Sequence, residues 1–207
     1  TFFFNLVQCR PLQTRGLGKN IEIPKLDSKE ECLFYSEGNF MGGNLRIPVD
    51  KIIFVDIHEY LEMPEQEKYQ VARYIGKLNQ ILKNQNVLLM GPGRWGTTTP
   101  SLGVPVHFTE ISHMAAICEI SYQDEGLMPE LSYGSHFFQD LVESGVFYIA
   151  LFKEQKNVVF HEEMLKKENL LANYISEAED YKKCIQVLDT KGMELYSDIS
   201  CQRVFCR

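Results

Sequence analysis

A glycine-rich segment, residues 91–99, carries the side chains in this sequence that are best suited to hold a ligand. It reads GPGRWGTTT and follows the apolar run Val87–Met90. Glycine lets backbone N–H groups approach an anion closely, because no Cβ intervenes. Arg94 can grip a phosphate or carboxylate through two parallel hydrogen bonds, and Trp95 can stack on a ring. The segment therefore predicts a site for a small anionic substrate, made by Gly91, Gly93, Arg94, Trp95, Gly96 and Thr97.

The same residues also fit a purely structural turn. In that interpretation Trp95 fills the core and Arg94 pairs with an acidic side chain. The spacing GPGRWG matches neither a P-loop, since no Gly-Lys-Ser/Thr follows, nor the GxGxxG dinucleotide fingerprint. The sequence leaves the ligand site and the structural turn as open alternatives.

His136, in GSHFFQDL, is a further candidate for the anion site. It stands near the start of a predicted helix, where the helix dipole disfavours the cationic imidazole and favours a neutral donor or acceptor. We expect it to lie beside the glycine segment. Its alternative role is to cap the helix while Phe137 and Phe138 fill the core.

Two other histidines have weaker patterns. His113, in SHMAAI, could accept a phosphoryl group, although a lone histidine of this kind is more often a surface residue or a hydrogen-bonded core residue. His58 could ligate a metal together with Asp56 or Glu59, but the spacing is unspecific. We therefore predict no metal site.

Composition and charge limit the class of protein. The chain has 207 residues, 44% of them hydrophobic, and a net charge of −7. An acidic chain is a poor general binder of nucleic acid or of anionic membranes, and neither a membrane span nor a signal peptide is visible. The six cysteines include no CxxC pair, which favours reduced structural thiols. We expect a cytoplasmic protein without nucleic-acid or membrane partners.

The elements that must position these side chains can be predicted from apolar periodicity. Helical spacing predicts a helix over 64–84, and apolar runs predict strands at 87–90, 114–122 and 146–152, the last central in a sheet. A helix over 114–122 is the alternative, since Ala and Met favour one. The segment GSHFFQDLVESG predicts a compact helix that Ser132 or Ser135 caps and Gly145 ends.

The two ends of the remaining chain have different patterns. Residues 31–57 alternate strand signals with glycine turns, which suggests an antiparallel meander. Residues 161–183 are charged and read as helical, and the last segments, CIQVLDT, MELYSDI and QRVFCR, predict final strands. The fold class we expect is α+β, with a mixed, largely antiparallel sheet and a few packed helices.

Three segments resemble a known family. FNLVQCRPLQ is similar to the last strand of the ATP-grasp nucleotide-binding domain of phosphoenolpyruvate synthase and pyruvate phosphate dikinase, which ends on a Gln-x-Arg-Pro signature, here Gln8–Pro11. LLMGPGRWGTTTPSLGVPVHFTEIS and LSYGSHFFQDLVESGVFYIALF resemble the C-terminal region of bacterial phosphoenolpyruvate synthase-like proteins. Together these segments cover most of residues 1–152.

The resemblance implies a division of the chain and a set of roles. Residues 1–13 would be the terminal strand of a preceding nucleotide-binding domain, 14–30 a linker and 31–207 a C-terminal α+β domain. Gln8 would help to hold the metal–nucleotide phosphates and Arg10 would contact the transferring phosphate, so ATP and Mg belong to the full-length protein and the fragment needs no cofactor.

The same family carries a phosphohistidine segment on a swivelling domain, and the residues around His113 only partly match it. No Gly-Gly pair precedes them, and Met114 separates the histidine from Ala115. We therefore expect this region to replace the swivelling domain.

The chain begins with Thr1, and we expect it to be a piece of a longer ATP-dependent phosphotransferase. Its role would be accessory: substrate recognition beside the ATP-grasp domain, with homo-oligomer formation a further possibility and no kinase activity in the fragment alone. The alternative is a purely structural dimerisation or docking module without a ligand.

Overall fold

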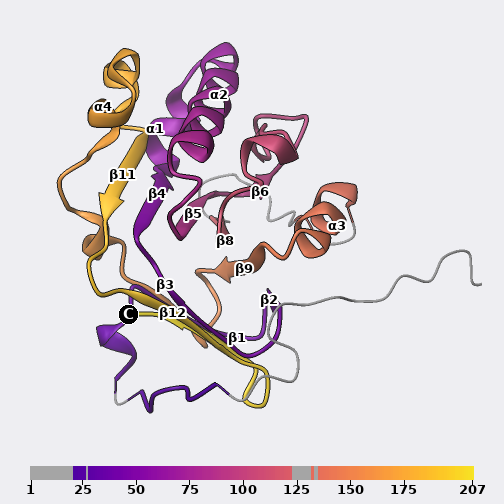
Figure 1. Cartoon of the computed structure of the whole chain (residues 1–207). Coiled ribbons are helices and arrows are strands. Elements are labelled where there is room, and N and C mark those ends of the chain that lie inside the picture. The colour runs from indigo at the N-terminus through magenta and orange to yellow at the C-terminus, as the bar shows by residue number, and fades with distance from the viewer. Residues whose placement is uncertain (1–20, 27, 123–131, 133–134) are drawn as a thin grey trace, which may run out of the picture.

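The computed structural model describes residues 21–26, 28–122, 132 and 135–207 (Figure 1). Helices cover one face of a six-stranded mixed sheet, and a five-stranded antiparallel sheet covers the other. In Figure 1 the helices α2 and α4 stand at the top and the strands β1, β3 and β12 lie at the bottom. The chain is thus an α+β protein, as its sequence predicts.

The six-stranded sheet has the order β11-β4-β5-β8-β9-β2. Its strands are Ile185–Asp189 (β11), Lys51–Val55 (β4), Val87–Pro92 (β5), Ala116–Ser121 (β8), Phe147–Phe152 (β9) and Phe40–Met41 (β2). The middle strands β4, β5, β8 and β9 run parallel, and the two edge strands are antiparallel to their neighbours. Continuous apolar runs form these parallel strands because the sheet is covered on both faces.

The order of the parallel strands explains why the helices share one face. Each of β4, β5, β8 and β9 is added on the same side of the one before it, and right-handed crossovers then place every connection on the same face. The connections contain Ile57–Glu62 (α1), Glu65–Ile81 (α2), Arg94–Trp95 (β6), Gly103–Val104 (β7), Phe108–Glu110 (η2) and His136–Glu143 (α3). The glycine segment and α3 therefore lie on the same face.

Burial alternates along β4 between two hydrophobic cores. Ile53 belongs to the core that α2 closes, with Val71 and Ile75 of that helix. Ile52 belongs instead to the core between the sheets, with Leu195. The predicted helix over 64–84 is confirmed as α2, which begins after Pro64 and has glutamates in its first turn.

The five-stranded sheet has the order β10-β1-β13-β12-β3 and is antiparallel throughout. Its strands are Val158–Phe160 (β10), Phe34–Glu37 (β1), Arg203–Cys206 (β13), Glu194–Asp198 (β12) and Leu45–Pro48 (β3). The one-turn helix Lys29–Glu31 (η1) precedes β1. Ile23 and Leu26 pack on the outer face of the five-stranded sheet, so the described part of the expected linker 14–30 contacts the domain.

The expected meander over 31–57 is wrong. β1 and β3 join the five-stranded sheet and β2 and β4 the six-stranded sheet, and none of the four pairs with another. Turn residues at Gly38 and Gly42 mark where the chain bends, but partners for these strands come from much later in the sequence. β9 also takes the position next to the short edge strand β2 rather than the centre of the sheet.

Residues 161–183 form single turns rather than continuous helix. The turns are Glu162–Leu165 (η4), Leu171–Tyr174 (α4) and Ser176–Tyr181 (η5). Asn169 interrupts the segment, because its side chain accepts hydrogen bonds from the backbone of Leu171 and Val187 and donates to Ile185 O. Such side-chain bonds compete with helix formation and here tie the segment to β11.

None of the helices in the described residues combines the length and hydrophobicity that crossing a bilayer requires.

Candidate functional site

The glycine segment begins where β5 ends and is held by bonds within the protein. Gly93 N donates to Ile120 O (2.8 Å), Arg94 N to Leu102 O (2.9 Å) and Gly96 N to Val104 O (3.0 Å). The expectation that these N–H groups cradle an anion is therefore wrong for these three, because each already has a partner. A ligand at this segment would have to be bound by other groups, the Arg94 side chain among them.

Glycines here allow close packing. A Cβ on Gly91 would lie 2.8 Å from the Trp95 ring. Gly96 has a φ of +73°, and a Cβ there would lie 2.4 Å from the Phe137 ring. The first residue lets the tryptophan lie flat against the strand, and the second lets the start of α3 pack on the turn.

Trp95 is fully buried beneath this turn. Its indole Nε1 donates to Cys118 O (3.2 Å), and its ring belongs to the core on the helical face of the sheet. This contact pattern matches the structural alternative for Trp95. Arg94, in contrast, keeps a partly exposed side chain at the carboxyl end of the parallel strands.

The structure brings the start of α3 to the glycine segment. Ser132 Oγ contacts Trp95 O (3.1 Å), and Phe137 packs on Gly96. Ser135 caps α3 by accepting a hydrogen bond from Phe138 N (3.2 Å), which confirms one of the two predicted caps. His136 is the first residue of the helix and is exposed.

Thr97 is buried and takes part in a local turn. Its hydroxyl accepts a hydrogen bond from Thr99 N (3.1 Å). Tyr60 of α1 reaches the same region and donates to Gly103 O (2.7 Å), next to the ladder between β6 and β7. The whole segment is thus a turn held by internal hydrogen bonds, and Arg94 lies partly exposed within it.

Glu119 of β8 connects these parts by hydrogen bonds. It was not among the candidates from the sequence. The side chain has no exposed surface. Its carboxylate accepts hydrogen bonds from Trp95 N (3.0 Å), Ser132 N (2.9 Å) and Tyr148 Oη (2.6 Å), and Ser132 Oγ is also in contact with it. One side chain therefore joins the glycine segment, the approach to α3, β8 and β9. The signal that could have revealed it is a lone acid in the otherwise apolar run AICEISY.

Burial raises the pKa of Glu119 above its usual value, although the hydrogen bonds from Ser132, Tyr148 and Trp95 act in the opposite direction. Desolvation penalises the ionised carboxylate, and the four contacts do not fully compensate for it. A raised pKa also reduces the repulsion that a nearby anion would meet. Glu119 is in this way compatible with an anion at the same edge of the sheet.

The remaining sequence candidates lie elsewhere. His113 is exposed, and its backbone N donates to Asn79 Oδ1 (2.9 Å). Asp56, considered with His58 for a metal, caps α1 by accepting from Glu59 N (3.1 Å). Across the described ranges, no three His, Cys, Asp or Glu side chains are arranged to hold a metal ion.

Residues 1–13, with the predicted nucleotide contacts Gln8 and Arg10, lie outside the described residues.

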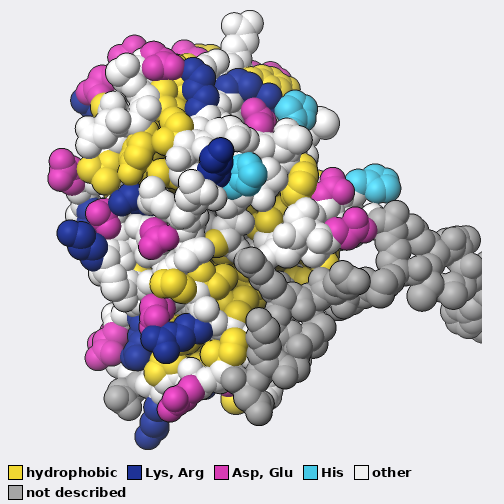
Figure 2. All heavy atoms as spheres, viewed as in Figure 1, with side chains coloured by type: hydrophobic (Ala, Val, Ile, Leu, Met, Phe, Trp, Pro, Cys, Tyr) yellow, Lys and Arg dark blue, Asp and Glu magenta, His cyan; other side chains and the backbone are white. Residues whose placement is uncertain are grey.

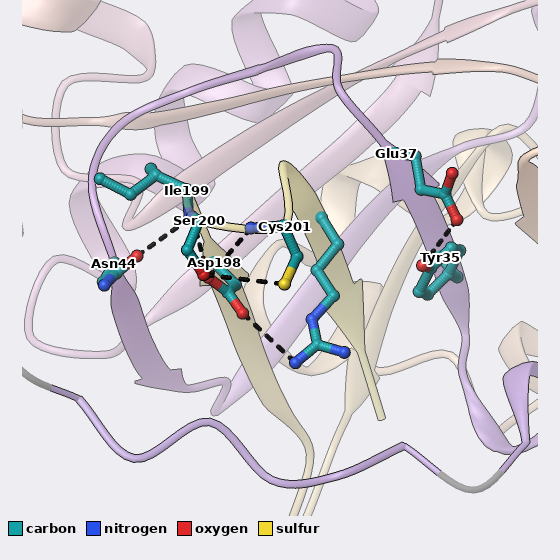
Figure 3. A network of polar contacts seen from close by, with 8 residues as sticks. Tyr35, Glu37, Asn44, Asp198, Ile199, Ser200 and Cys201 are labelled. Atoms are coloured by element: carbon teal, nitrogen blue, oxygen red, sulfur yellow. Dashed lines mark hydrogen bonds and ion pairs between the residues drawn. The ribbon is translucent and has the colours of Figure 1, made fainter.

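A network of polar contacts closes the hairpin between β12 and β13 (Figure 3). Asp198 accepts from Ser200 N (3.0 Å) and forms an ion pair with Arg203 (3.3 Å), while Asn44 Oδ1 accepts from Ile199 N (2.9 Å). Burial alone would raise the pKa of Asp198, but hydrogen bonds from Ser200 and Cys201 hold it below its usual value. These contacts give the network a structural role.

Free buried thiols fit the structural role predicted for the cysteines. Cys118, Cys184 and Cys206 are buried and unbridged. Desolvation raises the pKa of each thiol, to about 12 for Cys206, so the reactive thiolate is disfavoured.

A groove of about 760 Å³ lies along α2 on the helical side of the molecule. Ion pairs cross its margins, Arg73 with Glu110 (2.9 Å) and Lys77 with Glu177 (2.7 Å). The other lining residues are Gly76, Gln80, Ile81, Thr109, Tyr174 and Ile175. Figure 2 shows hydrophobic side chains gathered over the region of α2 and α4, with charges of both signs around them. Because each cation of the groove already has an acidic partner, the groove is not an evident anion site.

No family model, curated protein or solved structure matches this chain.

Proposed function

We propose that this chain is an accessory α+β domain that binds a small anion at the carboxyl edge of its parallel strands. The observation that carries the proposal is the position of Arg94. It lies partly exposed in a hydrogen-bonded turn at this edge, beside the start of α3. Because the parallel strands β4, β5, β8 and β9 all end at this edge, the loops that follow them meet here.

The side chains at this edge suit a phosphate or carboxylate. The Arg94 guanidinium presents a planar fork of donors that matches either group. His136 adds a ring nitrogen at the first residue of α3, where the helix dipole favours negative charge on a ligand. The buried indole of Trp95 supports the turn from below and does not contact the ligand.

The proposal includes a wider setting, which rests on the sequence resemblance. The domain would follow an ATP-grasp domain in a cytoplasmic phosphoenolpyruvate synthase-like phosphotransferase, with Gln8 and Arg10 contacting ATP and Mg in the complete protein. Phosphoryl transfer requires a metal, several cations and a positioned acceptor in one cleft. We therefore expect this chain alone to bind the anion without transferring phosphate.

Calorimetric titration of the chain with phosphate, pyruvate, phosphoenolpyruvate and ATP tests the proposal. Arg94→Ala should weaken anion binding roughly 10- to 100-fold, because it removes a charge-assisted hydrogen-bonded pair. Arg46→Ala is the matched control: it removes the same charge from an exposed ion pair with Glu194 on the other sheet. Equal losses in both variants, or no binding of any ligand by the unaltered chain, would refute the anion site.

A second candidate is a dimerisation module without a ligand, which the groove along α2 favours. Ile81 lines this groove and is 49% exposed, a large value for an isoleucine on a surface helix. A second copy of the chain would cover it. Sedimentation equilibrium should then show a dimer that Ile81→Lys converts to a monomer, and a monomer at all concentrations would exclude this candidate.

A further inference from the structure

We infer that Ser121 is a ligand-contacting residue of the anion site and that the anion is a phosphate group. The inference rests on the proposed function and extends it. The Ser121 hydroxyl would donate a hydrogen bond to a phosphate oxygen that Arg94 also holds. Ser121 was not among the candidates from the sequence.

The position of Ser121 on β8 is the first observation. It is the last residue of the strand, at the carboxyl edge. Side chains alternate along a strand, so Ser121 points to the same face as Glu119, whose carboxylate binds Trp95 N and Ser132 N. The bond from Gly93 N to Ile120 O places the first residue of the turn beside the last residues of β8. Ser121 therefore lies two residues beyond Glu119 on the same face, toward the edge where Arg94 lies.

The environment of the hydroxyl is the second, independent observation. Ser121 is 1% exposed, and within the part of the chain that the structure describes its Oγ has no hydrogen-bond partner. Buried polar groups almost always have a partner, so such a hydroxyl calls for an explanation. Glu119 and Ser132 on the same face are already engaged with each other and with Trp95. Unlike these two side chains, the Ser121 hydroxyl has no partner among the described residues, which makes a ligand oxygen its natural acceptor.

The number of donors favours phosphate over carboxylate. Arg94 belongs to β6, Ser121 to β8 and His136 to α3, so the ligand would be approached from three different elements. A carboxylate offers two oxygens in one plane, whereas a phosphate group offers three or more around a tetrahedral centre.

Ser36 provides a matched control within the same chain. It too is a fully buried strand serine, and its hydroxyl has no partner among the residues described. It lies on β1 in the antiparallel sheet, opposite Val158 and Val204 on the neighbouring strands. Replacing either serine by alanine removes an unpartnered hydroxyl from the interior, but only Ser121 stands at the proposed site.

The experiment is a calorimetric titration with inorganic phosphate and, separately, pyruvate, on the unaltered chain and the Ser121→Ala, Ser36→Ala and Arg94→Ala variants. We expect Ser121→Ala to weaken phosphate binding roughly tenfold and pyruvate binding less, because one hydrogen bond to a charged ligand is lost. Ser36→Ala should bind as the unaltered chain does. Phosphate binding that Arg94→Ala weakens but Ser121→Ala does not would overturn this inference and leave the proposed function standing. Tighter binding of pyruvate than of phosphate would overturn the phosphate assignment.

Absence of binding by the unaltered chain would refute the proposed function and this inference together, and so differs from the preceding outcomes.

Denaturation without ligand gives a second readout. We expect Ser121→Ala to be at least as stable as the unaltered chain, since no protein hydrogen bond is lost. A clear loss of stability would show that the hydroxyl has a structural partner and would count against the inference. Ser121→Cys, which keeps the size and weakens the donor, replaces the alanine variant if that variant does not fold, and the same loss of phosphate affinity is expected.

Discussion

Replacing Glu119 tests the central feature of this structure. Glu119→Ala would leave the buried donors Trp95 N, Ser132 N and Tyr148 Oη without their acceptor. Each unsatisfied buried donor costs about 1–3 kcal/mol, while the loss of a desolvated carboxylate offsets part of the sum. We expect the free energy of unfolding to fall by about 3–5 kcal/mol. A loss below about 1 kcal/mol would refute the idea that this residue fastens the edge of the sheet.

Glu119→Gln separates the charge from the hydrogen bonds. One oxygen becomes an NH₂ group that faces a buried donor, so we expect a loss of about 1–3 kcal/mol at neutral pH. The variant also lacks the titration of the carboxylate. Because burial raises the pKa of Glu119 above its ordinary 4.5, the folded chain keeps a proton that the unfolded chain has released. The stability from this proton is complete below about pH 4.5 and is lost as pH rises through the folded pKa.

The measurement is guanidinium denaturation from pH 4 to pH 8, followed by tryptophan emission. Trp95 is the chain's one tryptophan and lies in the fastened turn, so its emission reports on this region. The stability of the unaltered chain minus that of Glu119→Gln should decrease as pH rises, by at most about 1.4 kcal/mol per pH unit. Glu168→Gln, at an exposed position, should show no such trend. A difference that is flat or increases with pH would contradict the assignment of a raised pKa.

Two further predictions concern the turn and the helix beside it, both measured by the same denaturation. Gly96→Ala should lower the free energy of unfolding by about 2–4 kcal/mol, since it combines a positive φ with a clash against Phe137. Gly38→Ala has a similar φ (+76°) in open space and should lower it by only about 1–2 kcal/mol. Equal losses in the two variants would exclude the packing contribution. Ser135→Ala should lower the free energy of unfolding by about 1 kcal/mol, because α3 loses its cap. Ser144 is exposed at the other end of that helix, and Ser144→Ala should change stability by less than about 0.5 kcal/mol. Similar values for both variants would show that the cap is not stabilising.

Local elements were predictable wherever one physical signal decided them. The helical spacing of Val71, Ile75 and Leu78 specified α2, and the pair of Ser135 and Gly145 bounded α3. Strand partners were not predictable in this way. β1 pairs with β13, which lies at the other end of the sequence, and nothing in the turns at Gly38 and Gly42 could indicate that partner. The length of charged helix in 161–183 was overestimated, because its composition does not reveal that Asn169 bonds to the backbone of β11.

The position of the candidate site was predictable from the sequence, but the contacts of its residues were not. Glycines next to Arg94 located the turn, and the structure assigns them to close packing with Trp95 and Phe137. Single-sequence patterns cannot show that the N–H groups of the turn are already bonded, because their partners at Leu102, Val104 and Ile120 are fixed only by the fold. Two polar residues in an otherwise apolar strand, Glu119 and Ser121, were the sequence signal for the residues that the motifs did not single out.

Glu119 and Arg94 should therefore affect anion binding by different routes. Glu119 contacts the backbone of the turn and no exposed surface, so its replacement moves Arg94 and lowers both the stability of the fold and the affinity for phosphate. Arg94→Ala leaves the backbone bonds of the turn in place and should lower the affinity more than the stability. Tyr148→Phe removes one donor from Glu119 and should lower both quantities, by a smaller amount than Glu119→Ala. If stability and affinity fall in proportion among the Glu119 and Tyr148 variants but not in Arg94→Ala, the buried carboxylate positions the site and the arginine binds the ligand.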